Sequence, residues 1–147
     1  MQAIINKEAR ASYEFLDAWD AGIVLTGAEV KSVKKGQMRL QSAYVSFENS
    51  ELWLKNAHIA AYQRANQTGY DPERPRKILL TKKELTSLGG KLHEKGLTLV
   101  PEKVYSNGGL IKIRIVLARG LKKHDKRAKI KERDVNRTIA RALKNDY

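Results

Sequence analysis

The chain contains no cysteine, which excludes a disulfide framework and every site that needs a thiolate as metal ligand or nucleophile. Its three histidines, His58, His93 and His124, lie far apart and show none of the paired spacings of zinc sites. No apolar run approaches the roughly 20 residues of a membrane helix, and residues 1–6 lack the pattern of a secretory signal. We therefore expect a soluble, cytoplasmic protein without metal or cofactor.

The patterns of common catalytic sites are also missing. Gly89-Gly90-Lys91 lacks both the leading glycine and the following Ser or Thr of a phosphate-binding loop. No serine lies in a nucleophile elbow, and the acidic residues form no DxD-like cluster for a divalent metal. We predict no catalytic residue. A metal-dependent nuclease stays compatible with the charge of the chain, although no site supports it.

The chain has few acidic residues relative to its basic ones. Among 147 residues, 29 Lys and Arg stand against 16 Asp and Glu, which gives a net charge of +13 and a pI of about 10.0. Such an excess attracts polyanions, either nucleic-acid phosphates or an anionic lipid surface. Because the N-terminus carries no basic or apolar anchor, we favour nucleic acid. The length allows one compact body with an appendage.

Alternation of apolar and polar residues predicts several short strands in residues 1–119. The strands are expected at residues 13–25, 43–47, 52–54, 97–105 and 110–117. Residues 48–50 and 106–109 supply turns for two hairpins, and the polar segment 63–76 reads as a long surface connection.

Two capping boxes predict helices between these strands. Thr26 and Glu29 have the spacing of a capping box, so we expect a helix from Gly27 to Lys35 that ends at Gly36. A second box at residues 81–84 begins another helix, which ends before Gly96.

The last predicted strand has two distinct faces. Its isoleucines and Leu117 point to one side, whereas Lys112, Arg114 and Val116 point to the other. One side can build a core while the other meets phosphates. We predict a mainly β protein with embedded helices, arranged as an OB-like antiparallel barrel, closed or partly open. A flat sheet with two helices fits the pattern nearly as well.

The C-terminal tail, residues 120–147, differs from the body in composition. Ten Lys and Arg and four Asp and Glu give it a net charge of +6, almost half of the total. Val135, Ile139 and Leu143 recur every four residues and encode a helix, but their stripe is thin, and such a helix is marginal in water. We expect a tail that is disordered when free and helical on RNA. A solvated basic helix packed loosely on the body is the alternative.

Four segments carry a family resemblance: residues 21–32 (AGIVLTGAEVKS), 71–80 (DPERPRKILL), 96–101 (GLTLVP) and 122–134, with KKHDKR and IKERD. In their order and spacing they resemble the SmpB family over nearly the whole chain from Asn6. The resemblance implies an OB-like body and a non-catalytic adaptor in trans-translation. Such an adaptor binds the tRNA-like domain of transfer-messenger RNA and delivers it to the A site of stalled ribosomes.

The resemblance also implies site residues. Asp20, Leu79 and Lys112 fall where the family contacts RNA, although a leucine in an apolar run is ordinarily core. The full set of predicted RNA-binding residues is Asp20, Lys31, Arg76, Lys77, Leu79, Lys112 and Arg114. The tail that senses the empty mRNA channel is predicted to bind the ribosome through Gly120, Lys122, Lys123, His124, Asp125, Lys126, Arg127, Lys129, Lys131 and Arg133.

The implied partners are transfer-messenger RNA and the ribosome, the latter through small-subunit rRNA, the decoding centre and the mRNA channel. Elongation factor Tu is expected to associate with the protein indirectly, through the RNA that both bind. No membrane is expected as a partner. A general ribosome-associated protein, with affinity for ribosomal RNA but no preference for a tRNA-like fold, is the main competing interpretation.

Overall fold

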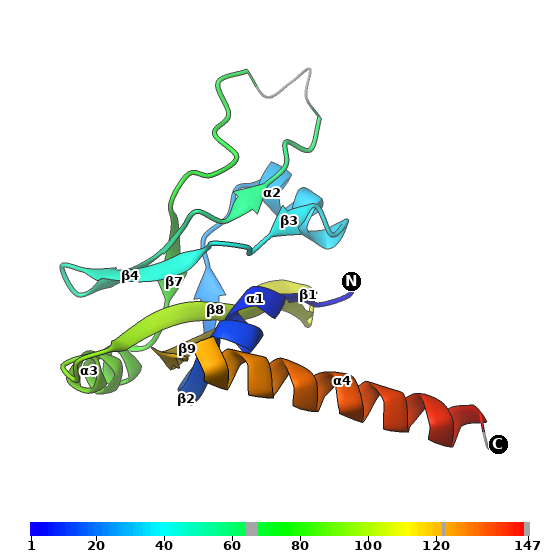
Figure 1. Ribbon diagram of the computed structural model, residues 1–147. Helices are drawn as coiled ribbons and strands as arrows, with labels where there is room; N and C mark the ends of the chain where they lie inside the picture. Colours follow the sequence, from blue (N-terminus) through cyan, green and yellow to red (C-terminus); the bar gives the residue numbers. More distant parts are fainter. Residues whose placement is uncertain (64–67, 122, 146–147) are drawn as a thin grey trace.

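The computed structural model describes residues 1–63, 68–121 and 123–145. Its main sheet has the strand order β1-β8-β4-β5-β7-β2-β9, and β8 also pairs with β9, so that every strand but β1 belongs to a near-ring (Figure 1). All pairings are antiparallel. The sheet strands are β1 (Ile4–Ile5), β2 (Tyr13–Ile23), β4 (Tyr44–Glu48), β5 (Glu51–Lys55), β7 (Arg76–Leu79), β8 (Leu97–Asn107) and β9 (Leu110–Gly120). The ring confirms the barrel and rules out the flat sheet.

Both predicted hairpins are present. β4 pairs with β5, and Asn49 and Ser50 turn the chain with positive φ angles of 50° and 62°. β8 pairs with β9 around Gly108 and Gly109, whose φ angles of 58° and 83° are the conformation that glycine adopts without a steric cost. These two turns set the registers of the strands that build most of the barrel.

Both capping boxes also form, and each starts a helix. Thr26 accepts from the Glu29 backbone N–H, and the Glu29 carboxylate accepts from the Thr26 backbone N–H, at the start of α2 (Gly27–Lys34). Thr81 and Glu84 make the same pair of bonds at α3 (Lys82–Lys91). Figure 1 shows the two helices on different sides of the strands.

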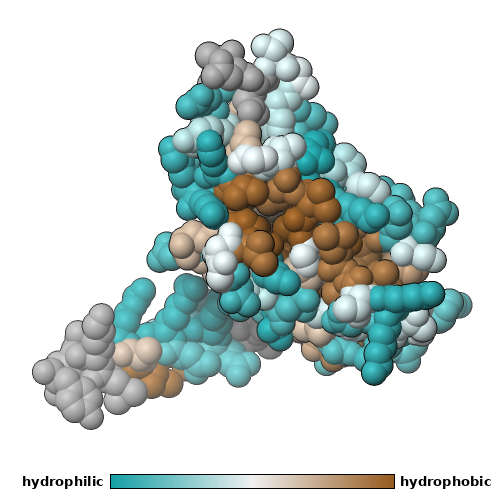
Figure 2. Space-filling model, turned by 180° about the vertical axis from the view of Figure 1, so that it is seen from behind, coloured by the Kyte–Doolittle hydropathy of each residue, from teal (hydrophilic) through white to brown (hydrophobic). Residues whose placement is uncertain are grey.

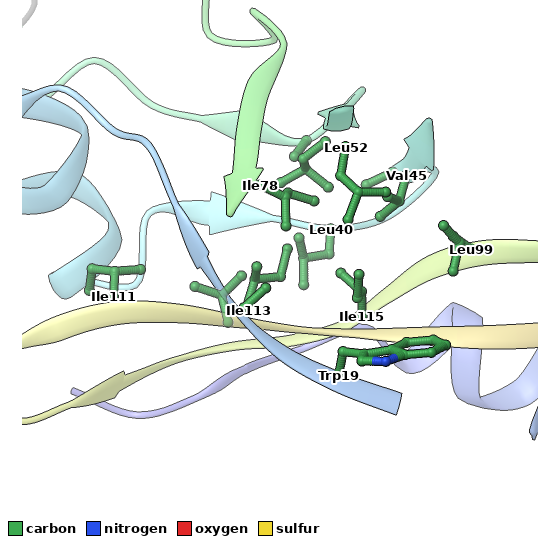
Figure 3. Packing of buried hydrophobic residues seen from close by; sticks show 14 of the residues in the cluster. Trp19, Leu40, Val45, Leu52, Ile78, Leu99, Ile111, Ile113 and Ile115 are labelled. Atoms are coloured by element: carbon green, nitrogen blue, oxygen red, sulfur yellow. The ribbon is translucent and has the colours of Figure 1, made fainter. Parts of the chain in front are cut away.

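The core fills the barrel with alternate residues of its strands. Figure 3 shows Ile113 and Ile115 of β9 pointing toward Leu40, Leu52 and Ile78. The helices add Val33 of α2 and Leu88 of α3, both without exposed surface. Burial of each such side chain contributes on the order of 1.5 to 3 kcal/mol, so packing holds the ring of strands together.

Four short elements have no signal in the periodicity. The first is α1 (Lys7–Ser12), which begins where the Asn6 side chain accepts from Ala9 N–H. The others are β1 and the two-stranded sheet of β3 (Met38–Arg39) with β6 (His58–Ile59). Elements of two residues are too short to show a period, so tertiary pairing alone defines them.

The C-terminal part forms one long helix, α4 (Lys123–Asn145), which passes α1 and projects beyond the barrel (Figure 1). It contacts α1. In Figure 2 the projecting helix is mostly hydrophilic with one small apolar area, and Val135 and Ile139 are about half exposed. The helix predicted from the four-residue spacing is therefore present, while its order in the absence of RNA stays a prediction.

Candidate nucleic-acid interface

The outer face of β7, β2, β9 and β8 gathers residues that are far apart in the sequence. Leu79 of β7 lies opposite Gly22 of β2, Gly22 lies opposite Lys112 of β9, and Lys112 lies opposite Tyr105 of β8. Residues directly opposite in adjacent antiparallel strands share one face of the sheet, so these four form a row across it. Asp20, two residues before Gly22, belongs to the same face. We call this face the outer row surface.

Leu79 is on the outside of the barrel. Its exposed fraction is 49%, so the structure rejects the alternative that it is a core leucine. Gly22 beside it carries no side chain, and the Leu79 Cβ lies only 3.5 Å from where a Cβ on that glycine would be. The pair therefore presents a flat apolar step that a nucleobase or ribose can approach. Seen from behind, the body shows an apolar area ringed by hydrophilic side chains (Figure 2).

Asp20 is fixed by its neighbours on the outer row surface. The Tyr105 hydroxyl donates to Asp20 Oδ1 at 2.7 Å, and Arg114 Nη1 lies 3.9 Å from Asp20 Oδ2. Burial, together with the hydrogen bond to Asp20, raises the pKa of Tyr105 to about 12. The hydroxyl therefore remains a donor at neutral pH and holds the carboxylate in one orientation, from which it can accept from an RNA amino group or ribose hydroxyl.

Glu102 of β8 connects this surface to α1. Its two carboxylate oxygens lie 3.0 Å from Arg114 Nε and 3.2 Å from Arg10 Nη2. Arg114 is thus shared between Glu102 and Asp20, and its guanidinium is held against the sheet. An arginine positioned in this way can present its remaining donors to a phosphate with little loss of side-chain entropy.

Lys112 and Lys77 supply positive charge on the same face. Within the described part of the chain, Lys112 Nζ has no carboxylate within 4.0 Å. Lys77 shares its face of β7 with Leu79 and makes a half-exposed ion pair with Glu51 at 3.3 Å. A surface pair of this kind is weak, so Lys77 can leave Glu51 and pair with a phosphate instead.

Arg76 does not fit the prediction that it contacts RNA. It has no exposed surface, and its Nε and Nη2 atoms donate to Glu29 Oε2 at 2.9 and 2.5 Å. The remaining donors reach the Ala57 and Pro72 carbonyls. All of its donor groups face the interior because Arg76 alternates with outward-facing Lys77, in the same register as Ile78. Its role in this structure is to hold the protein together.

Glu29 is the acceptor at the centre of this buried network. Burial would raise its pKa, but the hydrogen bonds from the Thr26 backbone, Arg74 and Arg76 outweigh that effect and lower the pKa to about 2. The Tyr70 hydroxyl lies 3.1 Å from Glu29 Oε2 and 2.9 Å from the Ile59 carbonyl oxygen, and its one hydrogen can be donated to either. The carboxylate thereby ties residues 70–76 to α2.

Lys31 stands apart from the outer row surface. It is exposed on α2, and its Nζ lies 5.3 Å from the centre of the Tyr62 ring. The structure therefore brings together Asp20, Lys77, Leu79, Lys112 and Arg114 and leaves Lys31 on another element.

The structure describes only part of the predicted tail site. Gly120 is exposed at the end of β9, Arg127 and Lys131 are exposed on α4, and Arg133 is partly buried on the side facing α1. Lys122 lies outside the described residues, as do the side chains of Lys123, His124, Asp125, Lys126 and Lys129.

The sequence analysis did not predict two contacts of the site, that of Tyr105 with its neighbours on the outer row surface and that of Glu102 with Arg114. The sequence contained a signal for the first. A turn at Gly108-Gly109 places Asn107 opposite Leu110, and counting back from that pair puts Tyr105 opposite Lys112. The partnership of Glu102 with Arg114 had no such signal, because a register shift between Pro101 and Lys103 moves Glu102 out of simple alternation.

Among the described residues, no group of three His, Asp or Glu side chains is placed to hold a metal ion. Within the same residues, none of the helices has the length and apolar content needed to cross a bilayer.

Comparison with known proteins identifies the family. The model described as SmpB protein matches residues 3–145. The chain belongs to the SmpB family. Two SsrA-binding proteins are similar along their lengths: that of Carboxydothermus hydrogenoformans is 45% identical over 100% of both chains, and that of Sulfurihydrogenibium sp. is 48% identical over 95% of this chain and 91% of its own.

A solved structure described as "tmRNA-SmpB: a journey to the center of the bacterial ribosome" has a TM-score of 0.69 and 42% identity, covering 87% of this chain and 94% of that one. These similarities confirm the resemblance to SmpB seen in the sequence and the mainly antiparallel barrel with short helices. Membership of the SmpB family also confirms the prediction of a non-catalytic protein.

Proposed function

We propose that this SmpB protein binds transfer-messenger RNA with its barrel and delivers the tRNA-like domain to the A site of stalled ribosomes. The observation that carries the proposal is the outer row surface, where an apolar step at Leu79, an oriented acid at Asp20 and the cations Lys112 and Arg114 lie side by side. Cations bind phosphates without regard to sequence, while the oriented acid and the apolar step select a folded RNA with bases or riboses in reach.

The C-terminal helix has the second task in this proposal. Inside an mRNA channel that is empty, α4 meets rRNA phosphates, which supply the counter-charge for residues such as Arg127 and Lys131. Both of these side chains are exposed and so available for that contact. Body and tail, residues 1–119 and 120–147, then act as separate functional units. All proposed partners, including elongation factor Tu contacted through the RNA, are cytoplasmic.

A competition experiment tests the choice of RNA. Labelled transfer-messenger RNA is bound to the protein and displaced either by an unlabelled tRNA-like fragment or by an unrelated hairpin, at the same salt concentration. We expect the tRNA-like fragment to compete far better. Equal competition by both RNAs would instead support the general ribosome-associated protein.

Variants separate the two tasks. Lys112→Ala is expected to weaken RNA binding and to lower the slope of log affinity against log salt by about 1, with exposed Lys83→Ala on α3 as the control. The triple variant Asp125→Ala, Lys126→Ala and Arg127→Ala is expected to bind the RNA normally and to fail in a ribosome-rescue assay. Equal loss of RNA binding in both variants would show that the body and the tail are not separable.

A further inference from the structure

Lys31 of α2 and Lys35, the C-cap residue of that helix, are placed over one aromatic ring. Lys31 Nζ lies 5.3 Å and Lys35 Nζ lies 4.9 Å from the centre of the Tyr62 ring. The two ammonium groups are therefore at most about 10 Å apart, the sum of these two distances. They come from positions i and i+4, which share one side of a helix. We call these three residues the Tyr62 cluster.

The segment that carries the ring is fixed to α2 close to Tyr62. The Ser32 hydroxyl donates to the Ala60 carbonyl at 2.7 Å, and the Ala60 N–H donates to the Gln37 carbonyl at 3.1 Å. Ser32 is completely buried, so the first of these bonds is shielded from water. Tyr62 is thus two residues from Ala60, whose backbone is hydrogen-bonded to residues of α2 and its C-terminal turn. These bonds hold the ring close to the two lysines.

The positive charge of the Tyr62 cluster is not neutralised by the chain. Within the described residues, no carboxylate lies within 4.0 Å of Lys31 or Lys35. Glu29 belongs to the same helix, but its carboxylate already accepts from Arg74 and Arg76. Two like charges held over one ring repel each other, and an anion that bridges them relieves that repulsion.

We infer that Lys31, Lys35 and Tyr62 form a second phosphate-binding site, which takes one phosphate or two successive phosphates of an RNA strand. The inference deepens the proposed function and rests on it. Lysine ammonium groups act as point charges toward phosphate and carry no base specificity, so this site adds affinity rather than selectivity. Contact with the Tyr62 ring keeps both ammonium groups near one place, which reduces the side-chain entropy that binding must remove.

The site is carried by different elements from the outer row surface, which lies on β7, β2, β9 and β8. RNA held at both places is bound at two separate points of the protein. The source of the phosphate is either the transfer-messenger RNA itself or the rRNA around it, and the same chemistry serves both. The experiment therefore needs one arm for each RNA.

The test uses the full-length protein with Lys31→Gln and Lys35→Gln combined. The matched control is Lys34→Gln, an exposed lysine on the same helix that does not lie over Tyr62. Binding is measured over a range of salt concentrations, once to transfer-messenger RNA and once to vacant small ribosomal subunits. We expect the double variant to lower the salt slope by about 0.9 to 1.8 in one of the two arms, while the control leaves it unchanged.

A second variant, Tyr62→Leu, separates the ring from the charges. Both lysines remain, so the number of neutralised phosphates and the salt slope should stay the same. Affinity should nevertheless fall in the same arm, because the freed lysines must be ordered upon binding. Urea unfolding of every variant shows whether the fold is intact.

Three results would overturn the inference: an unchanged salt slope for the double variant in both arms, an equal effect of Lys34→Gln, or a lower slope for Tyr62→Leu. Lys112→Ala in the same assay distinguishes this failure from failure of the proposed function. If Lys112→Ala weakens binding to transfer-messenger RNA and the double variant changes neither arm, only the Tyr62 cluster is refuted.

Discussion

Replacement of Arg76 by Met is predicted to cost the protein about 3 kcal/mol of stability at pH 7. The Glu29 side chain is only 1% exposed, and the substitution removes two of the donors that compensate its burial. Removing one partner of a buried pair typically costs about 3 to 5 kcal/mol. Arg74 still contacts the carboxylate, so we expect the lower end of that range.

The loss depends on pH in a defined direction. The pKa of Glu29 is lowered from 4.5 to about 2 in the folded protein, so the folded state favours the ionised carboxylate. The stability that comes from this shift is fully present above about pH 4.5 and is lost as the pH falls toward 2. A shift of this size corresponds to about 3 kcal/mol. Arg76→Met should therefore be less destabilising at pH 3 than at pH 7.

Equilibrium urea unfolding at several pH values measures both effects. The matched control is Lys77→Met on the neighbouring residue, whose exposed pair with Glu51 should contribute no more than about 1 kcal/mol. Combined with Glu29→Gln, Arg76→Met should cost less than the sum of the two single changes, because both remove the same interaction. Strict additivity, or a cost below 1 kcal/mol for Arg76→Met alone, would refute this account of the network.

Three further changes have defined outcomes. Tyr105→Phe removes the donor to Asp20, and in an ultraviolet titration it should abolish the tyrosine that ionises near pH 12 while weakening RNA binding. Gly36→Ala should lower the free energy of unfolding by about 1 kcal/mol, because the residue has a φ of 77° after α2. Val135→Ser with Ile139→Ser should change the urea midpoint of the body very little, since both side chains are half exposed, and a large shift would mean that α4 stabilises the barrel.

The larger elements were predictable because their signals are local. A capping box needs only four residues, and the pair Thr26 and Glu29 marked the start of α2 correctly. The alternation from Ile111 to Ile115 likewise separated inside from outside along β9. It failed at Val116, which was expected on the outer face but is buried in a second cluster with Ala9, Val100 and Ala118. Closure of the barrel was not predictable, because β4 meets β8 at the single register pair Val45 and Leu99. A contact between residues so far apart leaves no mark in periodicity.

In the candidate site, too, residues with a local sequence signal were predicted better than residues whose position depends on long-range contacts. Lys112 was placed by alternation, and its outward position agrees with that reasoning. Arg76 stands among the RNA-binding residues predicted from the resemblance, yet it has no exposed surface. The register itself was informative, since Arg76 and Ile78 are two apart and must share one face of β7. A charged residue in register with core residues indicates a buried partner, and here that partner is Glu29.

The buried network of Arg76 and Glu29 also helps to position Lys77 and Leu79, the proposed RNA-binding residues of β7. This strand is short, and it meets β2 through only two register pairs, Gly22 with Leu79 and Ile23 with Ile78. By contrast, β9 meets β2 along nearly its whole length. On its other side β7 is held by three register pairs with β5 and by Arg76, which joins the strand to α2 through Glu29. The position of Leu79 in the row with Gly22 and Lys112 depends on these contacts. If Leu79 binds RNA as proposed, loss of Arg76 should weaken that binding, although the arginine itself is buried.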